Sequence, residues 1–329
     1  TLTEDTVLIS RVGNDIFGLE ILERLAHRGL VTQYIKIDQS AHTGVGHVRV
    51  DEHGQYDTIV INGANWNLEE SDVDAFLADG YIPQYVVFNF EANVQFLKKI
   101  IPTFKALGSK IVMNFSPIVT DMMELLIMLD IAVMNLEEAQ QILNDVDKDP
   151  LLLLQRLKSL GPEAVVITQG AGGAVALGEN GGLLHVPAKK TAVKNTVGAG
   201  DGFLACLVYS LGIGIDLEQS MINATLVGEI ICSKREASLD NEDVSTEFLQ
   251  ILGGLANKSI ENMYGSAKRE IVKEVTKENI KVLRSIFDEK ENKISEINIY
   301  LGKKKIVFNS FEANLLAKNI GILYGKVRG

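Results

Sequence analysis

Short runs of apolar, mostly β-branched residues alternate with longer amphipathic stretches from Val7 to about Cys232. Such an alternation predicts an α/β domain built on a mainly parallel sheet. The apolar runs predict strands at residues 6–10, 85–89, 110–114, 131–135 and 164–168. The amphipathic stretches predict helices at residues 17–28, 94–107, 136–143 and 150–160. Because each run is apolar almost throughout, we expect its strand to be covered on both faces.

The overall composition excludes several classes of protein. With 329 residues, 46% of them hydrophobic, the chain can bury a sizeable core in one large domain, alone or with an appendage. Its formal net charge of -11 argues against nucleic acid or an anionic membrane as a general partner. No stretch approaches the ~20 apolar residues that cross a bilayer, and no secretory signal opens the chain. We therefore expect a cytoplasmic protein that acts on a small diffusible substrate.

The cysteines and histidines give no support to a metal hydrolase. Cys206 and Cys232 stand in apolar, helical contexts, where we expect them to be buried as small hydrophobic residues. The five histidines form no zinc-type pair at helical spacing.

Two regions depart from the alternating pattern. Residues 46–51 and 57–62, joined by residues 52–55, predict a hairpin that we expect to form a small β lid on the sheet edge. Residues 242–329 carry 15 Lys and Arg against 12 Asp and Glu, whereas residues 1–241 carry 17 against 31. This change predicts a domain over residues 1–256 and a C-terminal extension over residues 257–329. In the extension, the pattern predicts an exposed amphipathic helix at residues 266–289 and a hairpin at residues 296–309.

The segment from Asn195 to Asp201 carries the strongest chemical signal. Gly198, Ala199 and Gly200 are followed at once by Asp201 and by an apolar run with helical character. Glycines at a helix N-terminus let a phosphate approach backbone N–H groups, and the helix dipole stabilises negative charge there. An aspartate in the same turn can accept the proton of an attacking hydroxyl. The alternative is a glycine-bearing helix start capped by an acid.

Two further polar segments follow predicted strands. Thr168 begins a turn that contains Gly170 and Gly173, and Asn135 is followed by Glu138. In open parallel sheets ligands bind beyond the carboxyl ends of the strands, so we expect these two segments and Asp201 to line one crevice. The alternatives are a simple turn at residues 170–173 and a capping box in which Asn135 and Glu138 start a helix.

The segment from Asn195 to Asp201 resembles the Asp-Thr-x-Gly-Ala-Gly-Asp signature of the PfkB carbohydrate kinase family, and the ribokinases within it. The resemblance covers residues 6–252 and implies a ribokinase-like three-layer sandwich that binds ATP and Mg2+. It makes Asp201 the implied catalytic base and Gly198, Ala199 and Gly200 the implied anion hole. It assigns Mg2+ and the ATP phosphates to Asn135 and Glu138, with Glu138 nearest the metal. The remaining implied nucleotide contacts are Thr168, Gly170, Gly173 and, beside the adenine, Asn223.

The resemblance also implies a sugar site and a dimer. Lesser matches, at residues 11–15, 43–45, 63–65 and 114–117, are similar to ribokinases in particular. They imply that Glu91 hydrogen-bonds sugar hydroxyls and that Thr43 belongs to a substrate-covering lid, and such lids pair between protomers. For Glu91 the alternative is a solvated carboxylate at a strand end.

Three features depart from the family pattern. The chain opens at Thr1, after the point where the family has a first strand, a sugar-binding aspartate and a Gly-Gly turn, so we expect the natural start to lie upstream. Asn195 replaces an acidic residue, and residues 234–238 differ where a Gly-Ala pair is usual. Both differences lie where the family holds a monovalent cation, so they count against K+ activation.

Four functions follow from these observations. The first is transfer of the ATP γ-phosphoryl group to a small sugar, with D-ribose as the expected substrate. The second is the same reaction on another sugar, such as fructose, or on a nucleoside. The third is ATP binding without catalysis, and the fourth is an interaction role for the extension.

Overall fold

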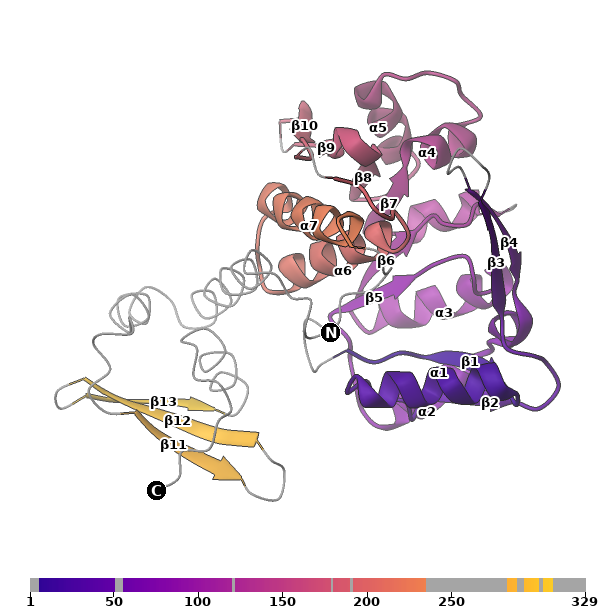
Figure 1. Ribbon diagram of the computed structural model, residues 1–329. Coiled ribbons are helices and arrows are strands. Elements are labelled where there is room, and N and C mark those ends of the chain that lie inside the picture. Colours follow the sequence, from indigo (N-terminus) through magenta and orange to yellow (C-terminus); the bar gives the residue numbers. More distant parts are fainter. Residues whose placement is uncertain are drawn as a thin grey trace.

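The computed structural model describes residues 6–50, 56–119, 122–178, 180–189 and 192–234, together with three strands between residues 283 and 309. Its largest unit is a six-stranded sheet in the order β10-β9-β8-β7-β6-β5 (Figure 1). Strands β5 to β8 are parallel, whereas β9 and β10 are antiparallel to their neighbours. Their bounds are β5 (Tyr85–Phe88), β6 (Lys110–Asn114), β7 (Ile131–Asn135), β8 (Ala164–Thr168), β9 (Ala174–Leu177) and β10 (Leu183–Val186). The predicted α/β class with a mainly parallel sheet is confirmed.

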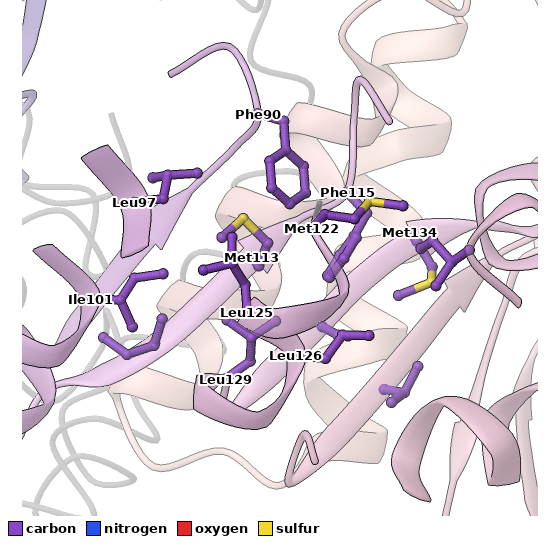
Figure 2. Packing of buried hydrophobic residues seen from close by; sticks show 14 of the residues in the cluster. Phe90, Leu97, Ile101, Met113, Phe115, Met122, Leu125, Leu126, Leu129 and Met134 are labelled. Atoms are coloured by element: carbon purple, nitrogen blue, oxygen red, sulfur yellow. The ribbon is translucent and has the colours of Figure 1, made fainter. Parts of the chain in front are cut away.

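This sheet is the middle layer of three. Successive side chains of a strand point to opposite faces, so Ile111 and Met113 of β6 join one core and Val112 joins the other. The first core is drawn in Figure 2, where Leu97 and Ile101 of α3 lie near Met113. Its helices are α2 (Glu70–Ala78), α3 (Val94–Ala106), η2 (Met123–Met128), α4 (Leu136–Leu143) and α5 (Pro150–Ser159). The second core packs under α6 (Ala199–Gly212) and α7 (Leu217–Cys232).

In Figure 1, β1 (Ser10–Gly13), β2 (Ile35–Asp38), α1 (Ile16–His27) and α2 lie beyond β5, and the hairpin of β3 (Val45–Val50) and β4 (Tyr56–Ile61) runs along the side of the central sheet. Strands β1 and β2 pair in parallel, with α1 between them in sequence. The predicted hairpin is confirmed by β3 and β4, which pair in antiparallel fashion and which we call the lid. A short 3-10 helix, η1 (Gly63–Asn67), and α2 follow the lid.

Most predicted boundaries agree with the structure to within one residue, and one predicted strand is wrong. The strand expected at residues 6–10 begins only at Ser10, and Val7 forms no more than an isolated bridge with Val31. The strand forms further along the chain because residues 10–13 pair with β2. Arg11 can lie inside this strand because carboxylates from elsewhere in the chain neutralise its charge. Helix α1 begins one residue earlier than expected because the Asp15 side chain accepts a hydrogen bond from the Gly18 N–H and caps it.

The extension contains a three-stranded antiparallel sheet in the order β11-β12-β13. The predicted hairpin is confirmed by β12 (Lys293–Leu301) and β13 (Lys304–Asn309). The predicted helix is wrong where β11 (Leu283–Asp288) stands, and residues 266–282 lie outside the described residues. Pairing with the isoleucine-rich β12 overrides the helical spacing in the sequence of this segment. The proposed boundary near residue 257 also lies outside the described residues.

Two other expectations concern single features. Cys206 is buried as expected, and burial raises the pKa of its thiol to about 11, whereas Cys232 is only partly buried. Among the residues that the structure describes, no helix is both long and apolar enough to cross a bilayer.

Candidate active site

The first site segment is the N-terminus of α6, which carries Asp201 in its first turn. Gly198 is the residue before the helix and has a left-handed backbone, with φ of 81°, which favours glycine. A Cβ added at Gly200 would meet no atom within 4 Å, so the space beside the first turn is open. The N–H of Ala199 donates to the Thr196 carbonyl at 3.2 Å, and the Asn195 side chain accepts from the Val197 N–H at 3.0 Å. The structure therefore offers an accessible helix N-terminus next to an exposed carboxylate.

The second segment joins β7 to α4. The Asn135 N–H donates to Glu138 Oε2 at 2.7 Å, and the Glu138 N–H donates to Asn135 Oδ1 at 2.8 Å. This reciprocal pair is a capping box, as the structural alternative predicted. Partial burial, with help from the charge of Glu137, raises the pKa of Glu138 despite hydrogen bonds from Asn135 and Ser116. The carboxylate is thus oriented by the helix start and retains further lone pairs for a ligand.

The third segment follows β8, beside the second. Asn135 and Thr168 are direct partners in the β7–β8 ladder, and both stand at the carboxyl ends of their strands. A short 3-10 turn at Gly170–Gly172 leads to Gly173, whose φ is 89°. A Cβ at Gly173 would lie 2.0 Å from the Val186 carbonyl oxygen, so only glycine fits there. The structure brings the two segments together as predicted from the strand order.

Glu91 lies three residues beyond the end of β5 and close enough to Asp201 for their charges to interact. Loss of hydration raises the pKa of the Glu91 carboxyl, and the negative charge of Asp201 raises it further. Asp201 therefore stands across from the carboxyl end of β5, on the edge of the sheet where β7 and β8 also end.

Two residues that were predicted to bind a ligand, Thr43 and Asn223, lie outside the segments described above. Thr43 is buried two residues before the lid, with its hydroxyl engaged by Asp15 and by the Gly13 N–H. Asn223 is half-buried on α7 and accepts a hydrogen bond from Gln219, one turn earlier, at 3.2 Å.

Sequence inspection missed a charged network beside the lid. The Arg11 guanidinium donates to both oxygens of Asp72, at 2.7 and 3.0 Å, and to Glu69 at 2.6 Å. Asp38 lies 3.4 Å from the same guanidinium, and Lys36 pairs with Asp72 at 3.1 Å. A polar groove of about 430 Å³ runs past this network and is separate from the Asp201 segment. No sequence signal identified it, because its partners are up to 61 residues apart.

Comparison with known proteins places this chain in a family. The model of the pfkB family carbohydrate kinases matches residues 1–244. A second model, the CfrBI restriction endonuclease, matches residues 213–329, a range that includes α7 of the kinase core. A deoxyribokinase of Salmonella typhi is 26% identical over 68% of this chain and 74% of its own length. A ribokinase of Staphylococcus aureus is 30% identical over 63% of this chain and 69% of its own.

Solved structures share the fold. Arabidopsis thaliana ribokinase complexed with ribose and ATP has a TM-score of 0.63 at 21% identity, covering 74% of this chain and 80% of its own. A putative ribokinase II of E. coli in complex with ATP and Mg2+ has a TM-score of 0.61 at 22% identity, covering 74% and 82%. Burkholderia thailandensis nucleoside kinase in complex with inosine has a TM-score of 0.61 at 16% identity, covering 76% and 80%. The fold is ribokinase-like, and the chain belongs to the pfkB family of carbohydrate kinases, which makes it a sugar kinase.

Proposed function

We propose that this kinase transfers the γ-phosphoryl group of ATP to a hydroxyl of a small sugar, with D-ribose as the first candidate. The observation that best supports this proposal is the position of Asp201, in the open first turn of α6 and near enough to Glu91 for their charges to interact. One carboxylate thereby faces the position of the reacting hydroxyl, and the other faces the remaining sugar hydroxyls. The ribokinase relatives support ribose, and the deoxyribokinase relatives make deoxyribose the nearest alternative pentose.

In this mechanism Asp201 accepts the proton of the attacking hydroxyl as its oxygen forms a bond to the γ-phosphorus. The bond from the γ-phosphorus to the bridging β-phosphate oxygen breaks, and ADP leaves. Backbone N–H groups of the segment Gly198–Gly200, aligned with the helix dipole, stabilise the charge on the transferring phosphoryl oxygens. Because the Ala199 N–H already donates to the Thr196 carbonyl, the N–H groups next to it provide most of this charge stabilisation.

The nucleotide and Mg2+ occupy the segments at the ends of β7 and β8. Complexes of related folds with ATP, and with ATP and Mg2+, support this assignment. Glu138 and Asn135 would hold Mg2+ and its water, and the backbone at Gly170 and Gly173 would bind the phosphates. In the described part of the chain no three His, Cys, Asp or Glu residues gather as metal ligands. Mg2+ prefers oxygen ligands and retains water, so the phosphates and water would complete its coordination beside Glu138. Mg2+ neutralises the phosphate charge when bound.

The remaining proposed roles belong to residues near the edges of the site. Asn223 lies beside the adenine. A monovalent cation would meet the Asn195 amide in place of a carboxylate, so K+ contributes little. Thr43 contributes to the sugar site from the base of the lid.

A panel assay separates ribose from the alternatives. Release of ADP should be fastest with D-ribose among ribose, deoxyribose, fructose and inosine, each measured with and without K+. Faster turnover of inosine would favour a nucleoside kinase, as the Burkholderia neighbour suggests. Binding of ATP without turnover of any acceptor would leave the non-catalytic alternative.

We further propose that the lid pairs with the lid of a second copy. Val45 and Ile61 are direct cross-strand partners and share one face with Ile59, and all three are exposed. Burying such a face between copies would remove apolar area from water. Light scattering at micromolar concentration should give the mass of a dimer, and Ile61→Glu should shift it toward a monomer. A monomeric mass for the unmutated protein would contradict this pairing.

A further inference from the structure

The lid joins the rest of the protein through two short legs, residues 39–44 and 62–67, which we call the lid base. The two legs cross in direct backbone contact. The Ala64 N–H donates to the His42 carbonyl at 2.8 Å. A Cβ added at Gly63 would lie 2.4 Å from that carbonyl oxygen, and one at Gly44 would lie 2.7 Å from the Asn62 carbonyl oxygen. No side chain fits between the legs, so a shift in one leg must be followed by the other.

One carboxylate, that of Asp15, fixes the incoming leg at Thr43. Asp15 Oδ1 accepts from the Thr43 hydroxyl at 2.6 Å and from the Gly18 N–H at 2.9 Å. Asp15 Oδ2 accepts from the Thr43 N–H at 2.8 Å, and the Thr43 oxygen in turn accepts from the Gly13 N–H at 3.0 Å. The hydrogen bonds from Thr43 and Gly18 hold the pKa of Asp15 at about 2. Thr43 is only 5% exposed, so its hydroxyl and N–H are used inside the protein.

The outgoing leg contacts the loop that carries Glu91. The Asn93 side chain donates to the Trp66 carbonyl at 2.7 Å and, more weakly, to the Leu68 carbonyl at 3.4 Å. Asn93 also caps α3 by accepting from the Phe96 N–H at 2.8 Å, and it is two residues from Glu91. A continuous set of hydrogen bonds and backbone contacts therefore links Thr43, the lid base, Asn93 and the Glu91 loop.

We infer that Asp15 and Thr43 are positioning residues for the sugar site. They hold the lid base at one place on the protein, and the lid base holds both the lid and the loop of Glu91. Thr43 thus affects the sugar through the lid and Glu91, without a contact of its own. This inference rests on the proposed function of Glu91 in binding sugar.

The test compares Thr43→Val with Thr43→Ser. Valine has nearly the shape of threonine but cannot donate to Asp15, whereas serine keeps the hydroxyl. Thr43→Val should raise the sugar KM about tenfold, the size expected for losing a hydrogen bond to a charged group. It should leave the ATP KM unchanged within about twofold, and Thr43→Ser should restore the wild-type sugar KM. Thr103→Val is the matched control, because it makes the same substitution at an exposed position of α3, outside the lid base.

Hydrogen exchange gives a readout that does not need turnover. In Thr43→Val, amide protons of β3 and β4 should exchange faster, while those of β6 and β7 keep their wild-type rates. Unchanged exchange in the lid, or a uniform increase across the whole domain, would overturn the inference, as would a sugar KM that does not move. If the unmutated protein phosphorylates no sugar, the proposed function fails, and lid exchange alone then decides whether Asp15 and Thr43 anchor the lid.

Discussion

Asp201→Asn should lower the rate of sugar phosphorylation by about 10²- to 10⁴-fold, the usual loss when a general base is removed. Asparagine keeps the size of the side chain but cannot accept a proton from the attacking hydroxyl. Nucleotide affinity should change little, because backbone N–H groups and Mg2+ provide most of the contacts to the phosphates. Initial rates at saturating ATP and sugar, together with calorimetric ATP binding, measure the two effects separately.

Glu218→Gln is the matched control, since Glu218 is an exposed acid in the first turn of the neighbouring helix α7. It should leave the rate at the wild-type value. Full sugar-dependent turnover by Asp201→Asn would remove the central residue of the mechanism.

Asp201→Asn should also change the pH dependence of sugar binding. Loss of hydration, and to a lesser extent the charge of Asp201, raise the pKa of Glu91 above its ordinary 4.5. Because the ionised carboxylate is the better acceptor for sugar hydroxyls, binding weakens as pH falls through this raised pKa. Removing the Asp201 charge lowers the pKa of Glu91, so Asp201→Asn should retain sugar binding to a lower pH than the wild type. Sugar titrations from pH 4 to 7 would show the shift, and identical profiles would argue that Glu91 does not bind the sugar.

The second large effect is expected on stability, from Asp72→Asn. Asp72 is buried on α2 and receives two hydrogen bonds from Arg11 as well as an ion pair from Lys36. Removing one partner of a buried pair leaves the other charge incompletely compensated, which typically costs about 3 kcal/mol or more. We expect the free energy of unfolding at pH 7 to fall by about 3 kcal/mol in urea titrations. Asp74→Asn, an identical change on the exposed side of the same helix, should have almost no effect.

The difference in the free energy of unfolding between wild type and Asp72→Asn should depend on pH in a defined direction. Burial opposes the charge of Asp72, but hydrogen bonds from Arg11, the Glu69 N–H and Lys36 outweigh it and lower the pKa below 3.8. A carboxyl with a lowered pKa contributes stability above its unfolded pKa and loses it as pH falls through its folded pKa. The gap between wild type and Asp72→Asn should therefore be complete at neutral pH and narrow below about pH 3.8. A gap that widens on acidification would contradict the role assigned to Arg11.

Local patterns predicted the parallel strands β5 to β8 of the central sheet but missed its antiparallel strands β9 and β10. Strands β6, β7 and β8 are continuous apolar runs bounded by polar residues, so burial on both faces and the chain direction determine their limits. The adjacency of the segments after β7 and β8 followed from the rule that ligands bind at the carboxyl ends of parallel strands, and their meeting with Asp201 in one crevice stays a prediction. Glycine at residue 173 was visible in the sequence, but the nearby Val186 carbonyl that requires it was not.

Interactions between distant parts of the chain were not predictable. Helix α2 was missed because its buried face includes the charged Asp72, which resembles a surface residue until Arg11 is placed beside it. Asp15 looked like part of a weak motif, and its role at the lid depends on Thr43, 28 residues away. The strand β11 was predicted as helix because helical spacing is local, whereas its pairing partner is not.

The two carboxylates proposed for catalysis, Asp201 and Glu138, belong to helices in opposite layers of the sandwich. Helix α6 packs in one core and α4 in the other. The hydrophobic contacts of one layer therefore cannot set the distance between the base and the metal-orienting group. That distance depends on the sheet between them, since β8, β9 and β10 separate β7 from the segment that leads into α6. The sheet thus aligns the reacting groups, and changes in its twist would alter the approach of hydroxyl to phosphate.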